Sequence, residues 1–238
     1  MIFKAARFVP LMVARRQIGW LRPELAARLA AWPEIFASSA EKVVLLKPEA
    51  LSGVVEDLAQ EGFIPGWRNE RYRIANLFDI ERAAARPFGL TTAAVHLNGI
   101  AFGAGHMWIA RRSATKPIDP GMLDNLVGGG IASGFSVQQT LMKEAWEEAG
   151  IPAELARAAT RGGTVEILRE VPEGVQSETI SVYDLVLPEG FEPKNQDGEV
   201  AGFQCLPLSE VLRLLEQPGQ FTLDAGLVAQ DYFKRAGL

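Results

Sequence analysis

The sequence is poor in the residues that build covalent or metal cross-links. Its 238 residues include one cysteine, Cys205, and two histidines, His96 and His106. A single cysteine cannot form an internal disulfide, and so few cysteines and histidines argue against a zinc site. The composition therefore excludes a disulfide-rich or zinc-stapled scaffold, and Cys205 is expected to be a buried, inert thiol.

Long apolar runs and an excess of positive charge are missing as well. Apolar stretches such as residues 43–46 fall far short of the ~20 residues that a membrane helix needs. The 24 lysines and arginines are outnumbered by 29 aspartates and glutamates, for a net charge of −5. That balance argues against nucleic-acid binding through a general positive field. With no export signal visible, we expect a cytoplasmic protein with no nucleic-acid or membrane partner, and a homodimer stays open.

What the sequence does contain is ordinary for a globular protein. Apolar residues make up 48% and charged residues 22% of the chain, and the length suits one or two domains. In the first third, a helix is expected over residues 23–32 and a strand over 43–46. A second helix is expected over 48–61 because its apolar residues recur at helical spacing: Leu51, Val54, Val55 and Leu58.

The pattern changes near residue 90. Strands are expected over 91–97 and 107–111, on either side of a glycine-rich turn at 103–105. We therefore predict an accessory domain over 1–90 and a second domain over 91–238. Mixed strands and helices favour an α/β or α+β sandwich, with a mixed sheet between helices. Further strands are expected over 164–168 and 177–187, and helices over 208–216 and 224–235.

The segment from Gly128 to Ile151 has the most specific pattern. Ser136 followed by Gln139 is a capping-box signature, so a helix is expected to begin there. Gly150 is expected to end it. Three small or apolar residues at i, i+4 and i+8 can face the core: Leu141, Ala145 and Ala149.

Three carboxylates recur on the same helix at i, i+3 and i+4. They are Glu144, Glu147 and Glu148, and only Lys143 is close enough to relieve their repulsion. Oxygen ligands gathered in this way can bind hard divalent cations. Alone, such a pattern is usually a solvated acidic face. Beside the glycine-rich loop expected at 128–130, whose backbone a ligand can approach closely, it predicts a metal platform.

The segment resembles the Nudix box, G-x5-E-x7-R-E-U-x-E-E-x-G-U, in which U is a bulky apolar residue. Phe135 stands where the box has its first glutamate, and Lys143 stands where it has arginine. The three glutamates of the helix are intact. The matching residues are Gly129, Glu144, Glu147, Glu148, Gly150 and Ile151.

The resemblance extends to one Nudix subgroup and covers nearly the whole chain. Residues 85–99, 110–134 and 182–200 are similar to the plant and fungal diphosphatases that act on thiamine diphosphate and its oxidised analogues. The same segment is found fused to fungal thiamine pyrophosphokinases. Residues 8–21 and 62–74 are similar to the accessory domain of that subgroup, which commonly has an apolar residue at the position of the first box glutamate.

The resemblance implies a Nudix fold and a hydrolase that uses Mg²⁺ or Mn²⁺ to attack a diphosphate with water. Glu144, Glu147 and Glu148 would hold the metal, with the Gly129 carbonyl as a further ligand. The catalytic base would be Glu144 or a later acid such as Glu199. The products would be a monophosphate and inorganic phosphate.

Cationic residues just before the box are candidates for substrate binding. Arg111, Arg112 and Lys116 follow an expected strand, and arginine suits bidentate phosphate contact. Surface charge at a strand end is the alternative. Asp124 and Asn125 precede the glycines and are expected to orient them through side-chain turns. His96 is expected to be structural or to line a pocket.

Two other functions stay open at this point. The chain could hydrolyse another organic diphosphate, such as a dinucleotide or a nucleotide sugar. It could also be a catalytically inactive Nudix module that binds a ligand, because Phe135 and Lys143 depart from the box. The intact glutamates favour an enzyme, since a protein freed from catalysis has no need of three repelling carboxylates.

Overall fold

The computed structural model describes residues 3–103 and 105–238, which form two compact units. The first unit takes in the described residues up to Thr92, together with 132–134 and 166–179. The second contains the rest. The division into domains at residue 90 stays a prediction. Of the glycine-rich turn expected at 103–105, Ala104 lies outside the described residues.

A four-stranded sheet with two helices forms most of the first unit. The strands have the order β2-β1-β4-β3, with β1 and β4 parallel and the other pairs antiparallel. The strand at β4 agrees with the expected one, whereas β1, β2 and β3 were not expected. Their bounds are Val9–Val13 (β1), Arg16–Leu21 (β2), Phe36–Ser38 (β3) and Val43–Leu45 (β4).

Both expected helices of this unit are present. Helix α1 spans Pro23–Leu29, and α2 spans Leu51–Gln60 after a short 3-10 turn at Pro48–Ala50. The predicted apolar stripe of α2 is buried in full, because Leu51, Val54, Val55 and Leu58 are at most 2% exposed. Further 3-10 turns span Ala5–Arg7 and Arg82–Ala84.

A hairpin of β5 (Arg71–Ile74) and β6 (Phe78–Glu81) completes the first unit. It holds the segment 132–134: the Ser133 amide donates to the Arg71 carbonyl, and the Ser133 hydroxyl donates to Asp79, both over 2.7 Å.

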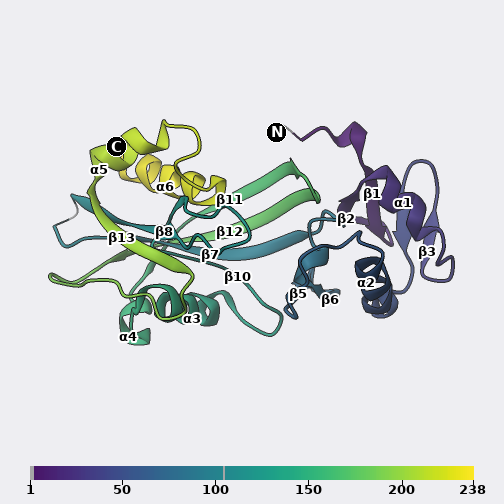
Figure 1. The fold of residues 1–238 in the computed structure, drawn as a ribbon, viewed down its shortest axis with the longest axis horizontal. Coiled ribbons are helices and arrows are strands. Elements are labelled where there is room, and N and C mark those ends of the chain that lie inside the picture. Colours follow the sequence, from purple (N-terminus) through teal and green to yellow (C-terminus); the bar gives the residue numbers. More distant parts are fainter. Residues whose placement is uncertain (1–2, 104) are drawn as a thin grey trace. The chain divides into compact units, whose positions relative to one another are not determined.

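The second unit is built on a seven-stranded sheet covered on both faces by helices, as the α/β sandwich prediction requires; residues 91–92 and 166–179 of its strands and turn belong to the first unit. The main path is β11-β12-β7-β8-β13, with β10 paired to β7 and β9 to β8. Figure 1 shows α3 and α4 on one face, with α5 and α6 on the other. The strands are Thr91–Ile100 (β7), His106–Arg112 (β8), Leu123–Asp124 (β9), Val127–Gly130 (β10), Thr160–Val171 (β11), Gly174–Val186 (β12) and Val200–Pro207 (β13).

Two apolar cores fill the layers of this unit. One lies under α3 (Val137–Ala149) and α4 (Ala153–Ala156), and the other lies under α5 (Leu208–Leu215) and α6 (Leu223–Ala236). Strand β7 contributes to the α3 side through Val95 and Leu97. Its alternate residues, His96 and Asn98, therefore face the side of α5 and α6.

Two observations bear on the expectations from composition. The thiol of Cys205 on β13 is exposed, so its predicted burial is wrong. It lies on an outer strand of the sheet, where one face of the strand meets solvent. Among the helices in the described parts of the chain, none has the length and apolar character needed to cross a bilayer.

Candidate active site

The acidic helix α3 begins and ends as its sequence predicts. The Ser136 hydroxyl accepts from the Gln139 amide, and the Gln139 side chain accepts from the Ser136 amide, which completes a capping box. At the other end, Gly150 adopts a left-handed conformation with φ of 65°. Leu141, Ala145 and Ala149 are buried, which fixes the rotation of the helix about its axis.

The glycine cluster beside the helix is a strand, so the prediction of a loop there is wrong. Gly128, Gly129 and Gly130 pair with β7 as part of β10. The side-chain space at the first two glycines is taken by other residues. A Cβ on Gly128 would lie 2.8 Å from Cε1 of His96, and one on Gly129 would lie 2.6 Å from Cδ of Glu144. Glycine is required here by close approach within the protein itself.

Glu148 is the buried member of the acidic group. Its side chain accepts from the Gly128 amide over 2.8 Å, and the residue is 6% exposed. Burial raises the pKa of its carboxyl to about 8; the Gly128 N–H opposes the shift, whereas the carboxylates of Asp124 and Glu144 add to it. Glu148 therefore differs from a residue of a solvated acidic face, which was the alternative for this pattern.

Glu144 and Glu147 are more accessible and share one cation. Lys143 Nζ lies 3.1 Å from Glu144 and 2.6 Å from Glu147. Burial raises the pKa of the Glu144 carboxyl, and Lys143 opposes the shift. Among the described residues, no three His, Cys, Asp or Glu side chains form a preassembled metal-binding group. Lys143 instead forms ion pairs with Glu144 and Glu147, two of the carboxylates that would bind a metal.

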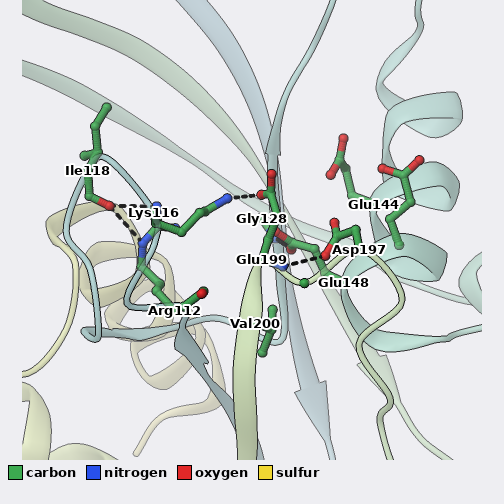
Figure 2. Close-up of polar contacts among 12 residues, drawn as sticks. Arg112, Lys116, Ile118, Gly128, Glu144, Glu148, Asp197, Glu199 and Val200 are labelled. Atoms are coloured by element: carbon green, nitrogen blue, oxygen red, sulfur yellow. Dashed lines mark hydrogen bonds and ion pairs between the residues drawn. The ribbon is translucent and has the colours of Figure 1, made fainter. Parts of the chain in front are cut away.

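A fourth acid, Asp197, approaches this group from the loop before β13. Backbone hydrogen bonds from Lys194 to Ala149 and from Gln196 to Glu147 attach this loop to the end of α3. Although Asp197 reaches solvent, desolvation by the surrounding protein raises its pKa, and Lys116 and Lys143 oppose the shift. Figure 2 shows its carboxylate beside Glu144 and Glu148.

The predicted base Glu199 and the predicted phosphate ligand Lys116 form an ion pair (Figure 2). The loop that carries Lys116 is also tied to Glu199 through the backbone, because the Ser113 amide donates to the Glu199 carbonyl over 2.8 Å. Lys116 lowers the pKa of Glu148, which it can do only from nearby. The structure thus brings both residues to the acidic group.

The two arginines of β8 differ in their surroundings. Arg112 forms an ion pair of 2.7 Å with Asp124 and also donates to the carbonyls of Ile118 and Asp119. Arg111 is exposed and donates to the Gly121 carbonyl over 2.8 Å. In this structure both guanidinium groups therefore serve the loop between β8 and β9.

Comparison with known proteins identifies the family of this fold and site. The model of the NUDIX domain matches residues 92–225, which is more than half of the chain. The chain belongs to the Nudix hydrolase family. Residues 2–92 match a second model, described as a domain of unknown function, DUF4743.

Relatives of this Nudix hydrolase match along its whole length. Nudix hydrolase 24, chloroplastic, of Arabidopsis thaliana is 36% identical over 99% of this chain and 69% of its own. Nudix hydrolase 20, chloroplastic, of the same plant is 34% identical over 98% of this chain and 69% of its own. These matches indicate an enzyme that hydrolyses an organic diphosphate.

A solved structure supports the fold alone. The crystal structure of DR0079 from Deinococcus radiodurans superposes with a TM-score of 0.51 at 23% identity. It covers 68% of this chain and 99% of that one. The Nudix prediction for the second domain's architecture is confirmed.

Nudix hydrolases generally use divalent metal ions, and the acidic group of this one fits such an ion. The donors are carboxylate oxygens, which Mg²⁺ and Mn²⁺ prefer. Burial and the nearby carboxylates of Asp124 and Glu144 disfavour the ionised form of Glu148, and Lys116 offsets this effect only in part. The lack of a side chain at Gly129 lets Glu144 lie against the strand backbone. A divalent cation would relieve the repulsion.

Sequence reasoning missed Asp197 and the burial of Glu148. The letters Asp197-Gly198-Glu199 indicate a turn, and only Glu199 was singled out there. The position of Asp197 depends on hydrogen bonds to the end of α3 from a loop some 45 residues further along the chain. Such a contact leaves no local signal.

Proposed function

We propose that this Nudix hydrolase cleaves the diphosphate of thiamine diphosphate or of its oxidised analogues, giving the monophosphate and inorganic phosphate. The observation that carries the chemistry is the buried Glu148 carboxylate, fixed to the Gly128 amide beside Glu144. The substrate class rests on the resemblance to the thiamine diphosphate subgroup over both parts of the chain.

Glu144, Glu147 and Glu148 would hold Mg²⁺ or Mn²⁺, with the Gly129 carbonyl as a further ligand. When bound, the metal neutralises the diphosphate charge and lowers the barrier to attack on phosphorus. Glu148 has a rigid position because it is buried and hydrogen-bonded. Glu147 is available once its pairing with Lys143 is exchanged for a stronger cation.

Lys116 would bind a phosphate of the substrate. Its side chain is only 19% exposed, and it faces the acidic group across the ion pair with Glu199. An incoming phosphate would compete with Glu199 for this cation. Arg111 could reach a phosphate from the exposed side of the loop, whereas Arg112 supports the loop through Asp124.

The catalytic base can be tested with two matched variants of one loop. Glu199 is neutralised by Lys116, whereas Asp197 lies near Glu144, and desolvation raises the pKa of its carboxyl, which makes the carboxylate a stronger base. We expect Asp197→Asn to lower kcat by about 100-fold and Glu199→Gln to lower it by less than about threefold. A larger loss in Glu199→Gln would return the role to Glu199, and equal, small losses in both would favour Glu144.

The substrate is tested by phosphate release from a panel of diphosphates, with and without Mg²⁺. The panel holds thiamine, oxothiamine and oxythiamine diphosphates, ADP-ribose, NADH and a UDP-sugar. We expect Mg²⁺-dependent release confined to the thiamine compounds. Turnover of a nucleotide instead would keep the Nudix chemistry and overturn the thiamine assignment. Turnover of no member, with Mn²⁺ also tried, would favour an inactive ligand-binding module.

A further inference from the structure

A buried chain of polar side chains runs through the second unit from β7 to α6. His96 Nδ1 lies 2.7 Å from Asn125 Oδ1, and Asn125 Nδ2 donates to Asn98 Oδ1 over 3.1 Å. Asn98 Nδ2 in turn donates to Asp184 over 2.9 Å, and Asp184 pairs with Arg235 over 2.6 Å. Asn98 and Asn125 are at most 2% exposed, so their amides need partners within the protein, and Asn125 Nδ2 also donates to the Ala225 carbonyl over 3.4 Å.

The direction of every hydrogen bond in this chain follows from its far end. The Asp184 carboxylate, paired with Arg235, can only accept, so Asn98 must present its NH₂ group to it. Asn98 Oδ1 then faces Asn125 and accepts from Asn125 Nδ2. Asn125 Oδ1 is left to face His96, and it can be satisfied only by a proton on Nδ1. Turning either amide over would set two acceptors or two donors against each other.

In the neutral imidazole, the chain therefore fixes the Nδ1–H tautomer and leaves Nε2 with a lone pair. Among the described residues, no hydrogen bond is made to Nε2. The residue is 8% exposed. Within the described part of the chain, Nε2 is not one of the fully buried side-chain atoms that lack a partner, so it reaches the surface, where a ligand can approach it.

The position of this imidazole links it to the acidic group. His96 pairs with Gly128 across the β7–β10 ladder, and its ring takes the side-chain space of Gly128. The Gly128 amide donates to Glu148. Gly128 therefore contacts both residues, with His96 on the α5 and α6 side of the sheet and Glu148 on α3.

We propose that His96 Nε2 accepts a hydrogen bond from an N–H or O–H group on the organic part of the substrate. Asn125, Asn98 and Asp184 are positioning residues that keep this nitrogen an acceptor. The proposal rests on the proposed function for the site but names a feature of the substrate that the metal chemistry does not require. It makes His96 a specificity residue, with α6 anchoring the arrangement through Arg235.

The tautomer can be read directly because the chain has only two histidines. In ¹⁵N spectra of protein labelled at histidine, at mildly alkaline pH, His96 is expected to show a protonated Nδ1 and an unprotonated Nε2. The exposed His106 serves as internal control, and His106→Gln assigns the signals. Asn125→Leu, or the milder Asp184→Asn if the first does not fold, is expected to shift His96 toward a mixture of tautomers. A protonated Nε2 in the wild type would overturn the proposal.

Contact with the substrate has two readouts. Adding the panel diphosphates with Ca²⁺ is expected to move the Nε2 resonance of His96 for those that bind, and no movement with any member overturns the contact. For thiamine diphosphate, His96→Leu is expected to raise KM by about threefold to tenfold with little change in kcat, the value of one hydrogen bond. His96→Gln, which retains an acceptor, is expected to recover part of the loss. An unchanged KM in His96→Leu would overturn the proposal, whereas failure of the wild type to hydrolyse thiamine diphosphate would instead overturn the substrate assignment.

Discussion

Glu148→Gln is expected to lower turnover by about 100-fold or more while leaving the protein at least as stable as the wild type. The loss follows if the carboxylate supplies several kcal/mol of stabilisation to the transition state through the metal. Stability is retained because the glutamine carbonyl still accepts from the Gly128 amide. The variant also removes a buried carboxyl whose ionised form is disfavoured by burial, Asp124 and Glu144.

The measurement is kcat with Mg²⁺ beside thermal unfolding of the same preparations. Glu154→Gln is the matched control, because Glu154 lies on α4 with its side chain 83% exposed. It should change neither quantity. Full turnover in Glu148→Gln would remove this residue from the mechanism, and a large fall in its melting temperature would make its role structural.

Arg112→Leu is expected to lower the free energy of unfolding by about 3 kcal/mol or more. Arg112 and Asp124 are both largely buried, at 18% and 12% side-chain exposure. Removing the guanidinium leaves a buried carboxylate without its ion-pair partner. It also frees the carbonyls of Ile118 and Asp119. The measurement is urea unfolding followed by circular dichroism.

Two further variants separate this structural role from substrate binding. Arg111→Leu, on the adjacent exposed residue, should lower the free energy of unfolding by less than about 1 kcal/mol. The double variant Arg112→Leu with Asp124→Asn should recover part of the loss, because no buried charge is then stranded. If Arg112→Leu instead kept its stability and lost activity, Arg112 would be a substrate ligand.

The parts of the fold that the sequence predicts are those with local signals. The stripe of α2 and the capping box and terminal Gly150 of α3 involve residues within a few positions of one another. Strands β1 and β2 escaped prediction because their turn has no glycine or asparagine where one is expected. Ala14 takes a left-handed conformation there, with φ of 51°.

The candidate site divides in the same way. The sequence predicts the acidic residues of α3, because their spacing correctly indicates that they lie on one helix. The sequence does not predict the strand at Gly128–Gly130, because glycine has a low strand propensity. The glycines are needed there because they leave space for His96 and Glu144, which is a long-range requirement. The polar chain from Asn125 to Arg235 joins residues 110 positions apart and has no sequence signal at all.

The most direct test of the account is the hydrolysis of thiamine diphosphate by the wild-type chain, followed by ³¹P NMR. With Mg²⁺ present, we predict thiamine monophosphate and inorganic phosphate in equal amounts, and with EDTA no reaction. Persistence of the diphosphate with both Mg²⁺ and Mn²⁺, or undiminished hydrolysis in EDTA, would contradict a metal-dependent thiamine diphosphatase.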